Sequence, residues 1–207
     1  MGTPSFAAPP APAPATATVP DARLSADARR VLGWIEQSGD NLELPFVIID
    51  KVGARVWAFD RNAVPQGSAA ALMGVGRGDV SPAGIGQRKL AEIAPADRIT
   101  PAGRFISGLG NDLGKADILW VDYDNAISLH RVVPGNRLDR RAQRLATAAT
   151  DDNRISYGCI NVPAGFFDTV IGPLFKRTNG IVYILPEAVP LSELFDLGRP
   201  RLAQKSF

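Results

Sequence analysis

The sequence predicts a mainly β domain with a few helices packed on it. Short apolar runs rich in Val, Ile, Trp and Phe recur between residues 45 and 132 and again at 180–185, and turn residues separate many of them. This is the pattern of successive strands. Helix signals occur in three stretches, near residues 25, 137 and 163. Apolar residues make up 45% of the 207 residues, enough for one substantial core.

The first predicted helix follows Ser25, which can cap it, and runs to about Ser38, where Gly39 is a natural stop. Two short strands follow, at 45–50 and 54–59, and a hairpin turn joins them. Apolar side chains recur along the helix at helical spacing, at Ala28, Val31, Leu32 and Ile35.

The middle of the chain reads as further strands. A third strand is expected at 69–75, before a Gly-rich loop at 74–86, and the run at 100–105 is a turn that enters another strand. Segments 118–123 and 126–132 form a hairpin that carries His130 on its second strand.

Two helices and one strand complete the prediction. Asn136 can cap a short helix from 137 to about 148, and Pro163 opens another at a first-turn position. Residues 180–185 form a final buried strand. The apolar face of the second of these helices consists of Phe166, Phe167, Val170, Ile171 and Leu174.

The N-terminal composition differs from the rest of the chain. The first twenty residues contain no charge, six prolines and six alanines, as in a disordered or polyproline-like tether. The predicted organisation is a tether (1–22), a helical extension (23–42), a main domain (43–190) and a C-terminal tail (191–207). Because such tethers often follow a cleaved export signal, we expect an exported protein of the periplasm or cell wall.

The charge balance and the rarity of Cys and His exclude several classes. Lys plus Arg total 23 and Asp plus Glu 21, so the net charge of +2 gives no electrostatic reason to expect nucleic acid. One cysteine and one histidine allow no internal disulfide and no cysteine-based zinc cluster. No apolar run approaches the length of a transmembrane helix. The sequence leaves the oligomeric state open.

Cys159 and His130 are the only residues of their types, and together they are the minimum for a thiolate–imidazole nucleophile. Gly158 permits a sharp turn, so the N–H groups of Gly158 and Cys159 can face one point and stabilise an oxyanion. A helix N-terminus near Pro163 favours the thiolate. On residue counts alone, a buried structural cysteine is the commoner case.

A motif sharpens this hypothesis. The segment ISLH at 127–130, followed by SYGCINVP at 156–163, resembles the active-site signature of the L,D-transpeptidase catalytic domain family. That signature is a histidine, a variable gap, then Ser/Thr-His-Gly-Cys, an aliphatic residue, and Asn or Arg. The Thr-Pro-x-Gly-x-Phe run at 100–105 is also typical of the family, and the resemblance covers about 45–187. It implies an L,D-transpeptidase-type β-sandwich or barrel with a helix after the catalytic cysteine.

Two features depart from the family pattern. Tyr157 stands where most members have a second histidine, and His130 lies 29 positions before Cys159, a longer gap than usual that includes an Arg-rich segment. With the Pro-rich N-terminus, these features resemble a proteobacterial subgroup that forms 1–3 crosslinks.

The resemblance implies cysteine acyl transfer on peptidoglycan stem peptides, without metal or cofactor. His130 takes the Cys159 proton, and the thiolate attacks the carbonyl of the third stem residue, usually meso-diaminopimelate. D-Ala leaves, and an amine acceptor resolves the thioester. An L-Ala acceptor gives a 1–3 crosslink and a diaminopimelate acceptor a 3–3 crosslink.

Other residues near the motif have assigned roles. The Arg131 carbonyl is expected to orient His130, Arg154 could meet a substrate carboxylate, and Ser156 orders the loop. Asn161 bonds either a substrate amide or its own loop, and Tyr157 either contacts the substrate or oxyanion or braces the loop. The arginines of 137–144 form a solvated face or meet the polyanionic stem peptide.

Two alternatives stay open. The protein could be a non-catalytic wall-binding module that keeps the fold, or a carboxypeptidase or hydrolase of the same fold. Acylation of Cys159 separates the first alternative from an enzyme, and product analysis separates the second.

Overall fold

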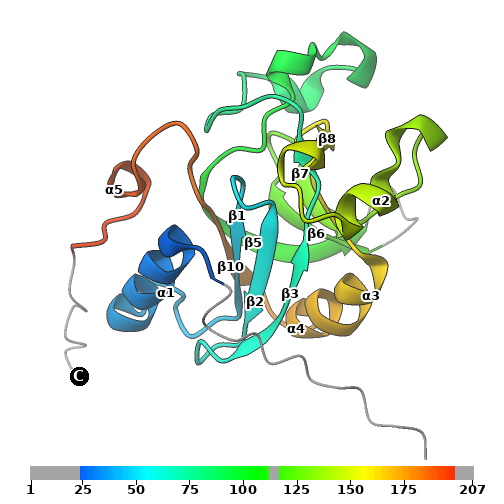
Figure 1. The fold of residues 1–207 in the computed structure, drawn as a ribbon. Coiled ribbons are helices and arrows are strands. Elements are labelled where there is room, and N and C mark those ends of the chain that lie inside the picture. Colours follow the sequence, from blue (N-terminus) through cyan, green and yellow to red (C-terminus); the bar gives the residue numbers. More distant parts are fainter. Residues whose placement is uncertain (1–23, 112–116, 199–207) are drawn as a thin grey trace, which may run out of the picture.

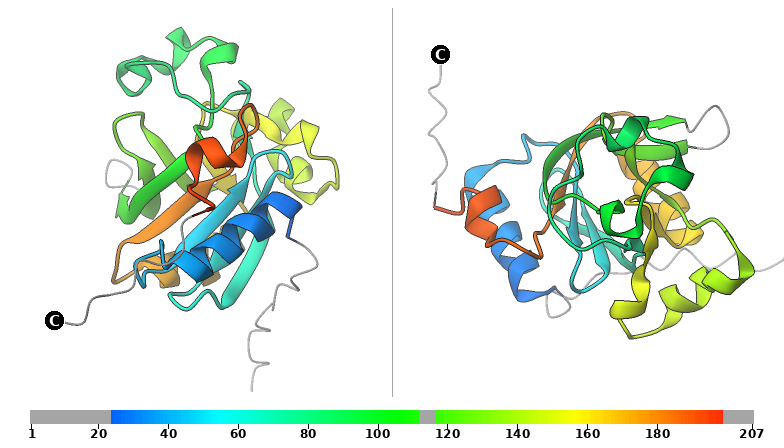
Figure 2. Two further views of the ribbon diagram at one scale, coloured as in Figure 1. Left: turned by 90° about the vertical axis from the view of Figure 1, so that its left-hand side faces the viewer. Right: turned by 90° about the horizontal axis from the view of Figure 1, so that it is seen from above.

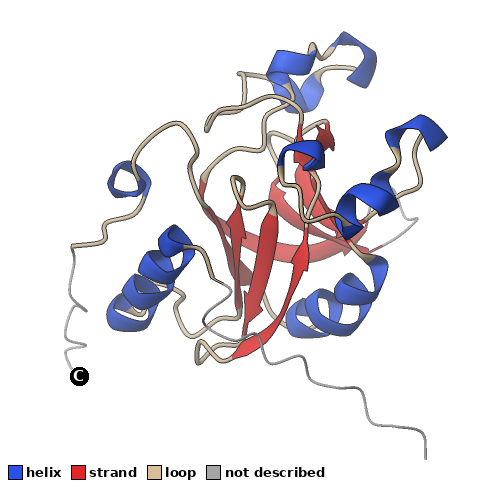
Figure 3. Cartoon of the chain, viewed as in Figure 1, coloured by secondary structure: helices blue, strands red, loops and turns tan. Residues whose placement is uncertain are grey.

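A computed structural model describes residues 24–111 and 117–198. Strands occupy the centre of the molecule and helices lie outside them (Figure 3). The predicted mainly β class with packed helices is therefore confirmed.

An eight-stranded mixed sheet forms the body of the protein, in the order β3-β2-β1-β10-β5-β6-β7-β9. Within it, β1 pairs with β10 and β7 pairs with β9 in parallel, and the other neighbours are antiparallel. The sheet curls strongly, as the view from above shows (Figure 2). Its strands are β1 (Phe46–Asp50), β2 (Arg55–Phe59), β3 (Pro65–Ala70), β5 (Gly103–Asn111), β6 (Asp117–Asp122), β7 (Ile127–Arg131), β9 (Ile160–Val162) and β10 (Gly180–Ile184).

Helix α1 (Ala26–Ser38) follows the sequence prediction closely. The Ser25 hydroxyl accepts the Ala28 N–H at 3.2 Å, and Gly39 ends the helix in the left-handed conformation with φ 69°. The helix lies along the outer face of β1, β2 and β10 (Figure 1), where it buries Val31 and Ile35.

The outer core joins the predicted helical extension, the main domain and the start of the C-terminal tail. Apolar side chains of α1 and of the sheet pack with Leu191 and Phe195, which belong to or follow α5 (Leu191–Leu194). The expected boundaries at 42/43 and 190/191 thus both fall within one packed cluster. The expected tether at 1–22 and most of the C-terminal tail, from residue 199 onward, lie outside the described residues.

The inner core lies between the concave face of the sheet and the helical run after Pro163. That run consists of α3 (Ala164–Phe166), a π-helical segment (Phe167–Ile171) and α4 (Gly172–Phe175). It buries Phe167, Ile171 and Phe175 against the strands. The predicted helix is therefore present, although Pro163 is its N-cap residue and not its first helical residue.

Two predicted elements differ from the structure. The strand expected at 69–75 is divided between β3 and the short strand β4 (Met73–Gly74), which leaves the main sheet to pair with β8 (Arg154–Ser156). The helix expected at 137–148 is a 3₁₀ turn at Arg137–Asp139 followed by α2 (Arg141–Ala146). Arg140 separates them because its φ of 49° is left-handed, which no continuous α-helix allows.

A long connection between β4 and β5 carries three 3₁₀ turns, at Ile85–Gln87, Leu90–Glu92 and Pro95–Asp97. It projects from the same end of the molecule as α2 and β8, at the top of Figure 1. No helix in the part of the chain that the structure describes is long and apolar enough to cross a membrane.

Candidate active site

Strand pairing brings the single histidine and the single cysteine together. His130 lies near the end of β7, and Cys159 lies in the loop between β8 and β9. Strand β9 runs parallel to β7 with His130 opposite Asn161 and Leu129 opposite Ile160. Cys159, directly before β9, is therefore held beside the segment 128–130, although 29 positions separate it from His130 in the sequence.

A backbone carbonyl determines the orientation of the imidazole. Nδ1 of His130 lies 2.7 Å from the carbonyl oxygen of Arg131. Because a carbonyl only accepts hydrogen bonds, Nδ1 must carry the proton, which leaves Nε2 as the basic nitrogen of the neutral ring. The Arg131 carbonyl thus has the position expected from the sequence.

The surroundings of Cys159 favour its thiolate. Partial burial raises the pKa of the Cys159 thiol. The hydrogen bond to His130, the positive charge that His130 carries when protonated, and hydrogen bonds from Ser128 outweigh this effect. The pKa of Cys159 therefore lies below its ordinary value. A lowered thiol pKa beside a histidine is the environment of a nucleophilic cysteine.

Ser128 is a contact that the sequence analysis did not assign. Its hydroxyl donates to Sγ of Cys159 at 3.7 Å, and Sγ in turn lies 3.5 Å from the carbonyl oxygen of Ala126. Because side chains alternate along a strand, Ser128 and His130 share a face of β7. This alternation is the signal that could have identified Ser128 from the sequence.

The loop of residues 157–159 between β8 and β9, which we call the nucleophile loop, requires glycine at position 158. Gly158 has φ 128°, and a Cβ atom there would lie 2.7 Å from the Ile99 carbonyl oxygen and 2.8 Å from Cδ1 of Ile127. The loop is therefore packed against the segment before β5 with no space for a side chain.

The hydroxyl of Ser156 organises the same loop. It donates to the Cys159 carbonyl at 2.6 Å and accepts the Gly158 N–H at 3.1 Å. This geometry corrects the expectation that the Gly158 and Cys159 N–H groups face one point, because the Gly158 N–H is directed to Ser156. Of that pair, only the Cys159 N–H is left as a candidate oxyanion donor.

The predicted helix-dipole effect on Cys159 does not apply. Strand β9 separates the cysteine from α3, which begins at Ala164. The field of a helix terminus falls off within about one turn. The lowered pKa of the thiol has its sources in His130 and Ser128 instead.

Tyr157 packs within the loop and against the long β4–β5 connection. The guanidinium carbon of Arg98 lies 3.9 Å from the centre of the Tyr157 ring, and Nε of Arg98 donates to the Ile93 carbonyl at 3.1 Å. One face of the ring is thus covered by a cation–π contact. This contact favours the bracing role of Tyr157 over a substrate contact by that face.

Arg154 belongs to a buried ion cluster and not to an open substrate site. Its guanidinium bonds both carboxylate oxygens of Glu187, at 3.2 and 2.6 Å, and donates to the Lys51 carbonyl at 3.0 Å. Only 8% of the Arg154 side chain is exposed. The sequence-based role of meeting a substrate carboxylate is therefore not supported by its position.

The same cluster, which we define as Lys51, Asp79, Arg154 and Glu187, joins four segments. Nζ of Lys51 is fully buried and donates to Asp79 and Gly78 at 2.6 Å and to the Thr100 carbonyl at 3.1 Å. Burial lowers the pKa of Lys51, against the opposing effect of Asp79. Asp79 also accepts the backbone N–H groups of 187–189.

The other predicted site residues are structural contacts. Asn161 is 1% exposed, donates to the Cys159 carbonyl at 3.3 Å and accepts from Arg141 at 3.2 Å. The Arg131 side chain pairs with Asp168 at 2.6 Å and lies over the Phe167 ring. Asn161 therefore bonds its own loop, the second of its two expected roles.

The Arg-rich segment is partly anchored. Arg141 bonds Asp139 at 3.1 Å as well as Asn161, and Arg144 donates to the carbonyls of Asp139 and Asp152. Arg137 and Arg140 are exposed. Two arginines thus fix the segment, Arg141 to Asn161 of β9 and Arg144 to Asp152 before β8, and the other two face solvent.

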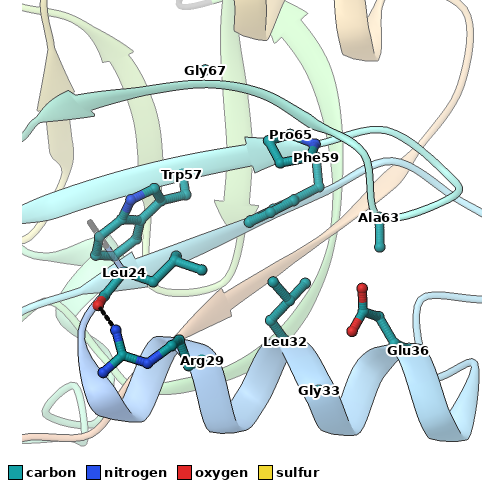
Figure 4. Close-up of a pocket in the computed structure, with 10 residues that line it drawn as sticks. All are labelled: Leu24, Arg29, Leu32, Gly33, Glu36, Trp57, Phe59, Ala63, Pro65 and Gly67. Carbon is teal, nitrogen blue, oxygen red and sulfur yellow. Dashed lines mark hydrogen bonds between the residues drawn. The ribbon is translucent and has the colours of Figure 1, made fainter. Parts of the chain in front are cut away.

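A pocket of about 420 Å³ lies elsewhere, between α1 and strands β2 and β3 (Figure 4). Leu32 of the helix faces Phe59 of the sheet across it, and Glu36 points toward Ala63. None of the predicted site residues lines this pocket. Among residues 24–111 and 117–198, no three His, Cys, Asp or Glu side chains are grouped as metal ligands.

Comparisons with known proteins give structural matches only. No family model and no curated protein matches the sequence. The helical cell shape determining protein Pgp2 from Campylobacter jejuni is 15% identical with a TM-score of 0.47, over 70% of this chain and 49% of that chain. The chain thus spans about half the length of Pgp2.

Two further structures are L,D-transpeptidases. The enzyme from Xylanimonas cellulosilytica is 15% identical with a TM-score of 0.40, over 68% of this chain and 60% of that chain. The catalytic domain from E. faecium is 15% identical with a TM-score of 0.39, over 69% of this chain and 98% of that domain. At these scores the matches carry no argument about function, which therefore depends on the site and on the sequence motif.

Proposed function

We propose that this protein is a cysteine L,D-transpeptidase that acts on peptidoglycan stem peptides. The observation that carries the proposal is the placement of its only cysteine beside its only histidine, with Nδ1 of His130 fixed by the Arg131 carbonyl at 2.7 Å. The class of substrate comes from the resemblance of 127–130 and 156–163 to the family signature, and the site geometry is compatible with it.

The reaction begins with proton transfer from Cys159 to Nε2 of His130. The thiolate adds to the carbonyl carbon of the third stem residue, and the C=O electrons move to oxygen. As the oxyanion collapses, the C–N bond to D-Ala breaks and the imidazolium protonates the leaving amine. The products of this half-reaction are free D-Ala and a Cys159 thioester.

The second half-reaction reverses these roles. An acceptor amine adds to the thioester carbonyl, His130 takes the amine proton, and the thiolate leaves as the new amide forms. With L-Ala as acceptor the product is a 1–3 crosslink, and with diaminopimelate it is a 3–3 crosslink. Water in place of the amine gives carboxypeptidase activity.

The test is incubation of the protein with disaccharide-tetrapeptide muropeptides, in parallel with Cys159→Ala, and analysis of the products by tandem mass spectrometry. The reaction mixture also contains a stem tetrapeptide without the disaccharide, whose L-Ala amine is free, so that both acceptors are available. Dimers that have lost one D-Ala, absent with the variant, support transpeptidation, and their fragmentation identifies the acceptor.

Two other outcomes decide against the proposal. Monomers trimmed to tripeptide, without any dimer, would assign a carboxypeptidase of the same fold. Unchanged muropeptides, with a folded protein and an alkylatable Cys159, would favour the non-catalytic wall-binding module.

A further inference from the structure

Thr100 lies directly beneath the nucleophile loop and is fully buried. Its hydroxyl makes two hydrogen bonds: it accepts the Gly74 N–H at 2.9 Å and donates to the Gly158 carbonyl at 2.7 Å. The side chain thus links β4, the segment before β5 and the residue that precedes Cys159. The family signature and the proposed reaction leave this hydroxyl without a role.

The bond to Gly158 determines where the Cys159 N–H points. In a planar trans peptide the C=O and the following N–H point in opposite directions. Because the Gly158 carbonyl is directed at Thr100, the N–H of Cys159 is directed away from Thr100. The N–H of the nucleophilic residue itself is an established type of oxyanion donor in acyl transfer.

The backbone of Thr100 is anchored by the buried ion cluster. Its carbonyl accepts from Nζ of Lys51 at 3.1 Å, and that ammonium is anchored by Asp79 and the Gly78 carbonyl. The next residue, Pro101, has a restricted φ. The buried ion cluster therefore supports the position of the threonine, and the threonine in turn fixes the Gly158–Cys159 peptide.

We propose that Thr100 is a positioning residue whose hydroxyl orients the Gly158–Cys159 peptide so that the Cys159 N–H donates to the oxyanion of acyl transfer. This inference rests on the proposed function, because it requires that Cys159 attacks a carbonyl carbon. It predicts a specific defect: loss of the hydroxyl slows reactions that pass through an oxyanion and spares reactions that do not.

Two small reagents separate these cases without peptidoglycan. p-Nitrophenyl acetate acylates the thiolate: the C–S bond forms, the carbonyl oxygen becomes an oxyanion, and its collapse expels p-nitrophenolate. Iodoacetamide alkylates the same thiolate by displacement of iodide, with no oxyanion. The ratio of the two second-order rates for Cys159, measured across pH, reports oxyanion stabilisation independently of thiolate formation.

The variants are Thr100→Val, which keeps the shape, Thr100→Ala, which leaves room for a water, and Thr100→Ser, which keeps the hydroxyl. We expect acylation to fall at least 10-fold in Thr100→Val, since removal of a complete oxyanion donor costs about 10²–10³-fold. The rate of alkylation by iodoacetamide should stay within about threefold of the wild-type rate, with an unchanged pH midpoint. Thr100→Ser should keep most of the wild-type acylation rate. If Thr100→Val does not fold, Thr100→Ala provides the same comparison.

Ile35→Ala, a destabilised variant on α1 remote from the loop, serves as the matched control and should leave the ratio unchanged. An equal fall of both rates, or no fall in either, in the Thr100 variants would overturn the inference. The inference would also be overturned if the acylation rate of Thr100→Ser were as low as that of Thr100→Ala. The proposed function can fail separately, because a wild-type protein that forms no muropeptide dimer still gives a measurable rate ratio.

Discussion

At the scale of single residues, reactivity depends on the contact between Cys159 and His130. Burial alone raises the thiol pKa, and His130 and Ser128 reverse this effect. The rate of iodoacetamide alkylation against pH should therefore have a midpoint below that of an ordinary cysteine thiol, since the pKa of Cys159 is lowered. In His130→Gln the midpoint should rise, because burial is then opposed by Ser128 alone.

Cys159→Ala supplies the background rate for this measurement. An identical midpoint in wild type and His130→Gln would contradict the assignment of His130 as the base.

Gly158 gives a second prediction at the residue scale. Gly158→Ala places a Cβ against the Ile99 carbonyl and forces alanine to φ 128°. The free energy of unfolding should fall by about 1–3 kcal/mol from backbone strain alone, and acylation of Cys159 should be lost. Urea denaturation and p-nitrophenyl acetate kinetics measure the two effects.

Gly165→Ala is the matched control, since nothing lies within 4 Å of its Cβ position in α3. It should be neutral or slightly stabilising, because alanine is favoured over glycine in a helix. Equal stability losses in the two variants would show that the Gly158 conformation is not required.

The sequence predicted single residues unevenly. The Cys159–His130 pair was accessible because each residue occurs once and lies in a recognisable motif. The roles of Thr100 and Arg154 could not be predicted, because their partners Gly158 and Glu187 are far away in the sequence. Only the folded chain brings Arg154 within 2.6 Å of a carboxylate that lies 33 positions later.

At the scale of elements, the buried ion cluster joins the turn after β1, strand β8, the β4–β5 connection and the segment after β10. In Glu187→Ala, the positive charges of Arg154 and Lys51 stay buried but lose one of their carboxylate partners. We expect a loss of about 3–5 kcal/mol in the free energy of unfolding, as for other broken buried pairs. Chemical denaturation followed by tryptophan fluorescence measures this loss.

Asp151→Ala is the control, since its pair with Arg77 at 3.0 Å is exposed and an exposed pair contributes little. If Glu187→Ala and Asp151→Ala lowered the free energy of unfolding by similar amounts, the buried ion cluster would not be an important source of stability.

Elements were predicted well where the signal was local. The cap at Ser25, the stop at Gly39 and the hairpin β1–β2 all depend on neighbouring residues and appear as expected. The short strands β8 and β9 were missed because each has three residues and pairs with a distant segment. The break at Arg140 was also missed, because its left-handed conformation has no glycine to signal it.

At the scale of the whole molecule, α1 shares the outer core with the sheet. Ile35→Ala should lower the free energy of unfolding by about 2–5 kcal/mol. If the outer and inner cores unfold together, hydrogen exchange in β6 and β7 should accelerate by the same free energy as exchange in α1. Mass spectrometry of exchanged peptides measures both regions at once.

Gln37→Ala, at an exposed position of α1 that does not line the pocket, is the control and should change neither region. Faster exchange confined to α1 in Ile35→Ala would show that the helix is a separate extension, as the sequence analysis had divided it.

The most direct test of the central claim is the mass of the acyl-enzyme. Wild-type protein mixed with a disaccharide-tetrapeptide donor and quenched in acid within seconds should gain the donor mass less one D-Ala. Digestion should place this adduct on Cys159, and Cys159→Ala should not form it. A folded wild-type protein whose Cys159 reacts with iodoacetamide but acquires no adduct would contradict the account.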